Sequence, residues 1–308
     1  MNQLPLVETS CGFIALVGAP NAGKSTLLNA LVGTKVSIVT HKAQTTRSQV
    51  RGVVTLEDKK AQLVFIDTPG IFAPKRRLDR AMVDSAWGGA GDADIVAFIL
   101  DAERGLGPDL ESLLEGLANV NHPKILILNK VDAVKREHLL KLSETINEKL
   151  RFEATFMISA LKGDGVHDFM DWCVKHIPPG PWHFPEDHLT DLTMAITAAE
   201  ITREKLFLRI HDEIPYNSTV ETESFKIQKD GSYKIDQVIY VTRDTHKKIV
   251  LGAGGRTIKT IGQESRKELM EMYEVPIHLF LFVKVREKWG DDPERYREMG
   301  LEYPHGKN

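Results

Sequence analysis

Hydrophobic residues fall in short continuous runs through the first part of the chain, from about Phe13 to Ile177. These runs are rich in Val, Ile and Phe, and they cover residues 13–18, 62–67, 94–101, 124–130 and 154–159. Continuous apolar runs are typical of parallel strands that are buried on both faces. Longer amphipathic stretches lie between them, and we expect helices over 25–32, 135–150 and 164–176. Strands that alternate with helices predict a doubly wound, mainly parallel α/β sheet with ligands at the carboxyl ends of its strands.

The pattern changes after residues 176–188, which hold four prolines and a glycine and therefore predict a linker. The elements expected beyond it are a helix over 189–212, strands over 220–227 and 233–242, a glycine loop, a helix over 257–273 and a strand over 277–285. This order, α-β-β-α-β, is that of a smaller α+β domain. We predict a first domain over 1–177, a linker over 178–188 and a second domain over 189–308.

Composition narrows the class of protein without deciding it. The 308 residues are 42% apolar and 27% charged, with a net charge of −3, so any nucleic-acid site has to be local. Cys11 and Cys173 form no disulfide framework and are expected to be buried thiols in a reducing compartment. The first ten residues lack the basic residues and the apolar core of a signal peptide, and no apolar run is long enough to span a bilayer. We therefore expect a soluble, cytoplasmic protein.

The sequence GAPNAGKS, at residues 18–25, directly follows a predicted strand and precedes a predicted helix. That context is the one in which a glycine-rich loop binds phosphate through its backbone N–H groups. Lys24 would neutralise the β- and γ-phosphates, and the Ser25 hydroxyl would bind Mg²⁺. The alternative, an ordinary turn between a strand and a helix, is weakened by the motifs that follow.

The sequence NKVD, at residues 129–132, ends another predicted strand and indicates which base is bound. The Asp132 carboxylate can accept hydrogen bonds from guanine N1–H and from its exocyclic amine, a pair of donors that adenine lacks. Ser159 and the Ala160 N–H are placed to pack beside the guanine ring. A metabolic P-loop kinase is disfavoured because guanine selection comes without an evident acceptor site.

Two polar segments are predicted to respond to the γ-phosphate. Asp67, at the start of the sequence DTPG, is placed to hold Mg²⁺ through a water, and the Gly70 N–H to sense the γ-phosphate. The segment 42–47 offers the Thr45 and Thr46 hydroxyls, of which we favour Thr46 as the ligand of Mg²⁺. The predicted catalytic residues are Lys24, Thr46 and Gly70, and the predicted metal ligands are Ser25, Thr46 and Asp67. The full predicted nucleotide site is Gly18, Ala19, Pro20, Asn21, Ala22, Gly23, Lys24, Ser25, Thr26, Thr45, Thr46, Asp67, Thr68, Pro69, Gly70, Ile71, Asn129, Lys130, Val131, Asp132, Ser159 and Ala160.

Taken in this order, these motifs match the translation-factor-related GTPases, and nearly the whole chain resembles the Era family of bacterial GTPases. The resemblance is carried by GAPNAGKSTLLN, KAQTTR, DTPG, NKVD, HFPEDH and KIVLGAGGRTIKTIG. It implies a GTPase domain followed by a KH domain of the second topological type. It also implies binding near the 3′ end of 16S ribosomal RNA, a role in maturation of the small ribosomal subunit, and a monomer. The resemblance permits peripheral association with the inner membrane.

The position after the DxxG glycine is Ile71, where the best-understood small GTPases have a glutamine that orients the attacking water. An apolar side chain cannot orient water by hydrogen bonding. We expect slow intrinsic hydrolysis, with the water positioned by backbone, by another side chain or by a partner.

A second glycine loop, at residues 252–255, fits the GxxG of a KH domain, which clamps a single-stranded backbone. We expect a strand before it and a helix after it, although a tight turn would also explain the pattern. Residues 243–267 hold seven basic and two acidic residues, so positive charge gathers beside the loop. The predicted RNA-binding residues are Lys247, Lys248, Gly252, Ala253, Gly254, Gly255, Arg256 and Lys259.

Three points stay open at the level of sequence. Ile249, Val250, Ile258 and Ile261 are either lining of an RNA groove or core residues. The acidic tail over 291–302 either covers the basic loop in the absence of RNA or is a solvated terminus. The alternative function is a signalling or membrane-associated GTPase whose second domain binds proteins, and it predicts that RNA affinity does not depend on Gly254 and Gly255.

Overall fold

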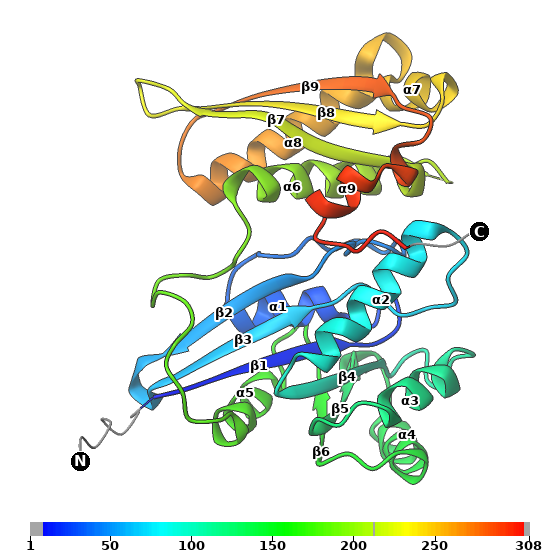
Figure 1. Cartoon of the computed structure of the whole chain (residues 1–308), viewed down its shortest axis with the longest axis vertical. Coiled ribbons are helices and arrows are strands. Elements are labelled where there is room, and N and C mark those ends of the chain that lie inside the picture. The colour runs from blue at the N-terminus through cyan, green and yellow to red at the C-terminus, as the bar shows by residue number, and fades with distance from the viewer. Residues whose placement is uncertain (1–8, 212, 305–308) are drawn as a thin grey trace. The chain divides into compact units, whose positions relative to one another are not determined.

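The computed structural model describes residues 9–211 and 213–304, which form two compact units (Figure 1). The described residues of the first unit run up to Ser37, from Thr46 to Asp191 and from Met299 onward. The second unit consists of Ile38–Thr45 and Leu192–Glu298. Most of the N-terminal stretch that lacks signal-peptide features, residues 1–8, lies outside the described residues.

The first unit is built on a six-stranded sheet with the order β2-β3-β1-β4-β5-β6. Its strands are β1 (Ser10–Val17), β2 (Val50–Leu56), β3 (Ala61–Asp67), β4 (Ile95–Asp101), β5 (Lys124–Asn129) and β6 (Ala154–Ile158). Neighbouring strands are parallel except for β2 and β3, which are antiparallel. Every residue of β3 and β4 is buried, as their continuous apolar sequences predict. The predicted doubly wound, mainly parallel sheet is confirmed.

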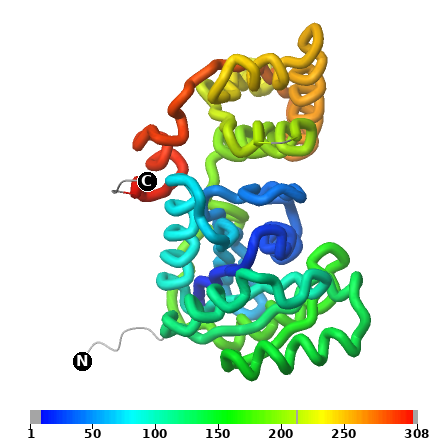
Figure 2. The backbone as a smooth tube through the Cα atoms, turned by 90° about the vertical axis from the view of Figure 1, so that its right-hand side faces the viewer, coloured from blue at the N-terminus to red at the C-terminus, as the bar shows by residue number. Residues whose placement is uncertain are grey.

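Helices cover both faces of this sheet. They are α1 (Lys24–Val32), α2 (Arg77–Gly91), α3 (Leu110–Ala118), α4 (Arg136–Lys149) and α5 (Val166–His176). Helices α1 and α5 contact each other, whereas α2, α3 and α4 contribute residues to a single core cluster with β4 and β5. In the side view of Figure 2, α1 and α2 lie on opposite sides of the strands. Because β1, β3, β4 and β5 are parallel, the loops that follow them gather at the same edge of the sheet.

The proline-rich stretch is anchored to the first unit. The fully buried Gln62 accepts hydrogen bonds from the N–H groups of His183 (2.9 Å) and Phe184 (3.0 Å). Farther along, Val53 donates its N–H to the carbonyl of Leu189 at 3.0 Å. These contacts explain why the division between the units falls after Asp191, beyond the predicted linker over 178–188.

The second unit contains a three-stranded sheet with the order β7-β8-β9. Its elements are α6 (Met194–Arg209), β7 (Ser218–Ile227), β8 (Tyr233–Val241), α7 (Asp244–Leu251), α8 (Arg256–Tyr273), β9 (Ile277–Val285) and α9 (Pro293–Glu298). Strands β7 and β8 are antiparallel, and β8 and β9 are parallel. Apolar residues of α6 and α8 pack on one face of this sheet. The predicted small α+β domain is confirmed.

One predicted feature of the second unit is wrong. The element directly before the glycine loop is helix α7, not a strand, so the order is α-β-β-α-α-β. Strand β8 ends at Val241, where Thr242 and Arg243 leave the sheet before the helix begins at Asp244. Helix α7 is short, and its apolar residues, Ile249–Leu251, all lie at its C-terminal end after five polar residues. The segment therefore shows no repeat of apolar residues at helical spacing, and hydrophobic periodicity could not indicate the helix.

The C-terminal residues of the second unit pack on its sheet rather than on the basic loop. Trp289 is buried and donates its indole N–H to the carbonyl of Asn217 at 3.0 Å. Arg295 of α9 forms an ion pair with Glu221 of β7 and lies over the ring of Tyr240, 4.8 Å from its centre. In this structure, the part of the acidic tail around Arg295 is therefore held by β7 and β8.

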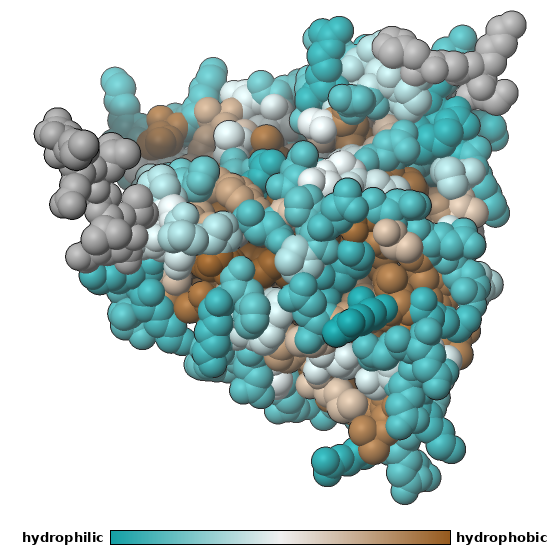
Figure 3. Space-filling model, turned by 60° about the horizontal axis from the view of Figure 1, so that its bottom comes forward, coloured by the Kyte–Doolittle hydropathy of each residue, from teal (hydrophilic) through white to brown (hydrophobic). Residues whose placement is uncertain are grey.

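Both cysteines are buried, as expected, and burial raises the pKa of each thiol. Hydrophobic residues appear as separate areas among hydrophilic ones on the face shown in Figure 3. Of the helices that the structure describes, none is long and apolar enough to cross a membrane.

Candidate functional site

The loop between β1 and α1 allows only glycine at two of its positions. A Cβ atom at Gly18 would lie 2.3 Å from the carbonyl oxygen of Ile99. At Gly23, where φ is 97°, a Cβ atom would lie 2.1 Å from the side-chain nitrogen of Asn129. Asn21 also has a positive φ, of 64°. The loop is thus packed tightly against the ends of β4 and β5, and its N–H groups lead into the N-terminus of α1, where an anion is favoured.

Lys24 is buried beneath this loop. Its Nζ donates hydrogen bonds to the carbonyls of Gly18 (3.1 Å) and Ala19 (2.9 Å). Burial lowers the pKa of Lys24 to about 8, and the nearby charge of Asp67 opposes that shift. A cation buried in this way is stabilised by an anion, and the phosphates of a nucleotide would supply one.

Four oxygen-bearing side chains converge beside Lys24. The Asp67 Oδ2 accepts hydrogen bonds from the hydroxyls of Ser25 (2.6 Å), Ser37 (2.9 Å) and Thr46 (3.2 Å), and the Ser25 and Thr46 hydroxyls are 2.9 Å apart. The Asp67 Oδ1 is buried and has no hydrogen-bond partner among the described residues. Burial raises the pKa of Asp67, while the charge of Lys24 counteracts the effect. An incompletely satisfied carboxylate among hydroxyl oxygens fits Mg²⁺, a cation that binds oxygen ligands.

The two threonine candidates point in different directions. Thr46 faces Ser25 and Asp67, whereas the Thr45 hydroxyl contacts the Thr40 hydroxyl at 2.6 Å and donates to the Lys42 carbonyl at 2.7 Å. This geometry favours Thr46 as the metal ligand, and the assignment stays a prediction. Ser37 was missed because its neighbours are apolar and no motif marks it.

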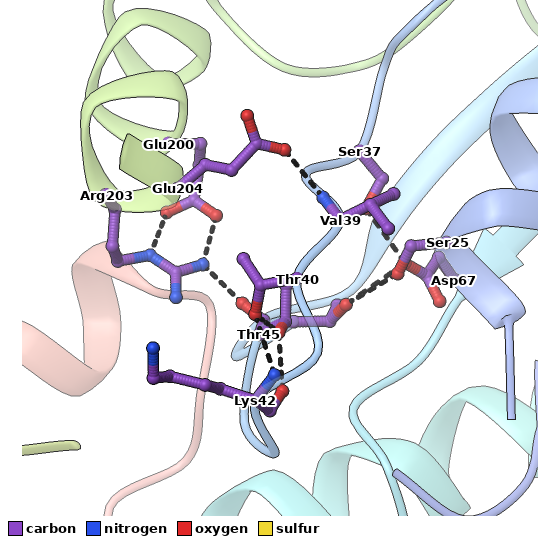
Figure 4. Close-up of polar contacts among 11 residues, drawn as sticks. Ser25, Ser37, Val39, Thr40, Lys42, Thr45, Asp67, Glu200, Arg203 and Glu204 are labelled. Carbon is purple, nitrogen blue, oxygen red and sulfur yellow. Dashed lines mark hydrogen bonds and ion pairs between the residues drawn. The ribbon is translucent and has the colours of Figure 1, made fainter. Parts of the chain in front are cut away.

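The segment Ile38–Thr45 is held by helix α6 of the second unit (Figure 4). Arg203, which is 2% exposed, donates to the Thr45 carbonyl at 2.5 Å and forms an ion pair with Glu200. The Glu204 carboxylate accepts from the Val39 N–H at 2.9 Å. Lys42 adds a hydrogen bond from its Nζ to the Phe207 carbonyl. The segment immediately before Thr46 is therefore fixed at several points rather than left as a free loop.

The segment after β3 passes close to the phosphate loop. A Cβ atom at Gly70 would lie 2.8 Å from the Cα of Pro20, and the Ile71 N–H donates to the Gly18 carbonyl at 3.1 Å. The Thr68 hydroxyl instead donates to the Leu16 carbonyl at 2.7 Å. The side chains of Thr68 and Ile71 are thus buried inside the protein, and in this structure the Ile71 N–H is bonded to the phosphate loop itself.

The motif predicted to bind the base connects three loops. Asn129 donates to the Ala22 carbonyl at 2.8 Å and accepts from the Ala160 N–H at 3.0 Å. The Asp132 Oδ1 accepts from the Ser159 hydroxyl at 2.7 Å, which lowers the pKa of Asp132 and keeps its carboxylate ionised. The Asn129 side chain therefore connects the phosphate loop to residues 159–160 through hydrogen bonds. The Ala160 N–H, which we expected beside the guanine ring, is directed to Asn129 in this structure.

Lys130 has a positive φ of 65° and forms an ion pair with Asp101 at 2.6 Å. Lys162 approaches Asp132 at 3.5 Å. Neither Asp101 nor Lys162 belongs to the predicted site, although Asp101 ends a buried strand, which is the signal that could have found it. The other predicted residues lie in the phosphate loop, in the first turn of α1, after β3 or in the turn after β5; they are Ala19, Pro20, Asn21, Ala22, Thr26, Pro69 and Val131.

In the second unit, the glycine loop joins α7 to α8 with three residues of positive φ: Gly252 (72°), Gly254 (59°) and Gly255 (76°). A Cβ atom at Gly252 would lie 2.2 Å from the Thr257 hydroxyl, whereas those at Gly254 and Gly255 would meet open space. Ala253 is exposed, and so are the nearby cations Lys248, Arg256 and Lys259, whereas Lys247 is half-buried. The loop therefore exposes backbone and positive charge at the N-terminus of α8.

A groove of about 280 Å³ lies between α8 and β9. It is lined by Ile258, Lys259, Gly262, Gln263, Arg266, Leu279 and Leu281. Of the apolar candidates from the sequence, Ile258 lines this groove, Ile249 is about half exposed, and Val250 and Ile261 are fully buried in the core. The groove combines apolar walls with two cations, which are the groups that bind bases and phosphates.

Sequence comparison divides the chain in a similar way. Residues 13–130 match the family described as "50S ribosome-binding GTPase", and residues 213–290 match the family described as "KH domain". The chain is 61% identical over 298 residues to GTPase Era of Sinorhizobium medicae, covering 97% of this chain and 96% of that protein. It is 62% identical over 305 residues to GTPase Era of Agrobacterium fabrum, covering 99% of this chain and 95% of that protein.

Solved structures show the same likeness over both units. One is Era in complex with MgGDPNP and nucleotides 1506–1542 of 16S ribosomal RNA, with a TM-score of 0.90 and 37% identity. Another is a tyrosine-to-alanine variant of Aquifex aeolicus Era bound to GDP.AlF4⁻, with the same TM-score and identity. Each likeness covers 95% of this chain and 99% of the other.

Proposed function

The chain belongs to the Era family of GTPases, and we propose that its nucleotide state controls an RNA-binding domain that acts near the 3′ end of 16S ribosomal RNA in small-subunit maturation. The observation that carries this proposal is the likeness to Era bound to that RNA, with a TM-score of 0.90 over 95% of this chain. The glycine loop and the groove beside it supply the local chemistry.

In the hydrolysis of GTP, water attacks the γ-phosphorus, and the bond from the γ-phosphorus to the oxygen that bridges the β- and γ-phosphates breaks to release GDP and phosphate. Lys24 would neutralise charge on the β- and γ-phosphates, where charge is spread in the transition state. The Gly70 N–H would approach the γ-phosphate from the other side. Mg²⁺, held by Ser25, Thr46 and Asp67, would neutralise the phosphate oxygens.

Hydrolysis by the free protein is expected to be slow, because the residue after Gly70 has no group that can orient water. Ile71 is buried in the hydrophobic core. The water would have to be positioned by backbone or by a group that assembly with RNA brings into place. Single-turnover hydrolysis that RNA leaves unchanged would contradict this coupling.

The RNA would bind as a single strand across the second unit. Its backbone would lie on Gly252–Gly255, within reach of Lys248 and Arg256, and its bases would enter the groove that Ile258 and Leu281 line. Positive charge concentrated at this loop supports phosphate binding even though the whole chain is slightly acidic. We expect action in the cytoplasm as a monomer, with the inner membrane surface as a further place of action.

The direct test is binding of an RNA fragment with the sequence of nucleotides 1506–1542 to the full chain loaded with GDPNP and Mg²⁺. Gly254→Asp/Gly255→Asp should weaken binding at least about tenfold, because two carboxylates would lie where phosphates pass. The control is Gly290→Asp, at another glycine with open space around it, which should retain affinity. Equal affinity of wild type and the double variant would favour a protein-binding second domain instead.

The partner itself can be identified by sequencing RNA that is crosslinked to the protein in cells. We expect reads concentrated near the 3′ end of 16S ribosomal RNA. A random population of RNA would contradict the assignment.

A further inference from the structure

Strand β9 presents two aromatic rings on the face of its sheet that is turned away from the helices. Leu279 and Leu281 point to the helix side, where they pack against the apolar clusters of the unit. Because side chains alternate along a strand, Phe280 and Phe282 point to the opposite face. They are 46% and 52% exposed. Two neighbouring exposed phenylalanines are uncommon on a soluble domain and indicate a binding surface.

The rest of this face is partly covered, whereas these two rings remain about half exposed, with Lys234 beside that of Phe280. Arg286 and Arg295 lie over the ring of Tyr240, which pairs in register with Lys284 farther along β9. The C-terminal residues therefore shield the end of the face near Tyr240. The part near Phe280 and Phe282 remains open.

The open rings are continuous with the groove in which we place RNA. Strand β9 is the edge of the sheet, since the order is β7-β8-β9. Leu279 and Leu281 line the groove on one side of this edge, while Phe280 and Phe282 lie on the other side. A strand of RNA that leaves the groove across β9 has to pass only one strand, about 5 Å wide, to reach the rings.

The charges along this path suit a polyanion. The nine residues of β9 contain no acid, and none of the seven residues that line the groove is acidic. The Lys234 Nζ lies over the ring of Phe280, 5.4 Å from its centre. Lys234 and Lys284 are near Asp236 (3.8 Å) and Glu223 (2.7 Å), yet their side chains remain 44% and 51% exposed. Both lysine side chains are thus partly exposed on the path of the RNA, although each lies beside a carboxylate.

The spacing of the rings also suits single-stranded RNA. Residues two apart in a strand are about 6.6 Å apart, so successive unstacked bases can each meet one ring. Aromatic rings on an open sheet face, with cations beside them, are a common way to bind such bases without reading their sequence. We propose that Phe280 and Phe282 form a base-stacking platform that binds single-stranded RNA continuing beyond the groove. This proposal rests on the proposed RNA-binding function of the second unit.

The test compares short and long RNA on the full chain loaded with GDPNP and Mg²⁺. The probes are three fluorescent single-stranded RNAs that share a core segment, which binds in the groove. One consists of the core alone, the second extends it at the 5′ end, and the third extends it at the 3′ end. Binding is followed by fluorescence anisotropy. For Phe280→Ala/Phe282→Ala, we expect the core to bind as in wild type and one extended RNA to lose about tenfold in affinity or more.

Two further variants separate stacking from simple apolar contact. Phe280→Tyr/Phe282→Tyr keeps the rings and should bind the extended RNA like wild type. Phe280→Leu/Phe282→Leu keeps apolar surface without rings and should behave like the alanine variant. Ile227→Ala, which removes another exposed apolar side chain from the same sheet, is the matched control and should change nothing.

Several results would overturn the platform. One is an unchanged affinity of the alanine variant for both extended RNAs. Another is a loss of affinity for the core RNA alone that equals the loss for the extended RNA. Full binding of extended RNA by the leucine variant would also overturn it, as would a wild-type dimer in sedimentation that the alanine variant abolishes. If Gly254→Asp/Gly255→Asp lowers the affinity for every RNA while the phenylalanine variants lower none, RNA binding in the groove is supported and the platform is excluded. If the wild-type protein binds none of these RNAs, both the proposed RNA-binding function and the platform are excluded.

Discussion

The guanidinium of Arg203 donates a hydrogen bond to the main-chain carbonyl of Thr45, the residue directly before the predicted metal ligand Thr46. Arg203 belongs to α6, and it is among the most deeply buried charged side chains in the described part of the chain. A buried guanidinium is stable only when it is paired. Here its partners are Glu200 and the segment that ends at Thr45, so the position of Thr45 is set by a charged hydrogen bond.

We predict that Arg203→Met lowers affinity for GTP with Mg²⁺ about tenfold, which is the usual effect of losing one charged hydrogen bond. Affinity for GDP should change much less, because Thr46 is expected to contact Mg²⁺ only when the γ-phosphate is present. The measurement is the ratio of the two dissociation constants by calorimetry. A ratio is insensitive to a general loss of folded protein.

The matched control is Arg203→Lys, which keeps the positive charge but loses the planar group of donors. It should fall between wild type and Arg203→Met. If both variants lower GTP and GDP affinity equally, Arg203 supports only the fold of its own unit.

Gly70→Ala should slow hydrolysis of GTP about a hundredfold while leaving GDP affinity close to that of wild type. The new Cβ atom would lie 2.8 Å from the backbone of Pro20, so the segment after β3 has to move away from the phosphate loop. A displacement of about 1 Å in a catalytic segment has an effect of this size. Single-turnover hydrolysis with excess protein is the measurement.

Gly88→Ala is the control for that experiment. Gly88 lies in α2 with open space around it, so alanine should leave the rate unchanged and raise stability slightly. A normal rate in Gly70→Ala would show that the close approach to Pro20 has no part in catalysis.

Much of the fold was predictable because its core strands have an unambiguous pattern. β4 is a continuous buried run of seven residues, six of them apolar, and its alternation with helices predicted a mainly parallel sheet. Strand β2 was missed because VRGVVTL mixes buried and half-buried positions at the antiparallel edge. Helix α7 was missed because its eight residues begin with five polar ones and show no apolar repeat at helical spacing.

In the candidate site, residues in short sequence motifs could be predicted, whereas residues that act through contacts with distant parts of the chain could not. Lys24, Asp67 and Asp132 lie in motifs whose chemistry is evident from residue type and position. Ser37 and Arg203 carry no such signal, since each acts through a partner far away in the chain: Asp67 for Ser37 and Thr45 for Arg203. Contacts of this kind depend on the folded arrangement, and hydrophobic patterns do not report them.

Asp132→Asn should lower affinity for GTP about a hundredfold and create a preference for xanthosine triphosphate. The carboxylate accepts two hydrogen bonds from guanine in the proposed site, whereas the amide of asparagine can donate to the oxygen that xanthine has in place of the guanine amine. Competition between the two nucleotides for the same protein measures the change. Ser159→Ala, which removes the hydroxyl bonded to Asp132, should lower GTP affinity without changing the preferred base. Retained preference for GTP in Asp132→Asn would exclude the assigned base contact.

Gln62→Leu should detach the stretch around His183 and Phe184 from the first unit. The Gln62 side chain accepts from both N–H groups and donates to the Phe184 carbonyl at 2.9 Å, so leucine leaves three backbone groups without their partner. Loss of these buried bonds should lower the free energy of unfolding by about 2–4 kcal/mol. Denaturant unfolding measures that loss, and hydrogen exchange should show faster exchange at the amides of His183 and Phe184. Gln228→Leu, at an exposed position in the β7–β8 turn, should change neither quantity. Unchanged exchange at both amides in Gln62→Leu would show that the backbone pairing of Val53 with Leu189 is enough to hold the stretch in place.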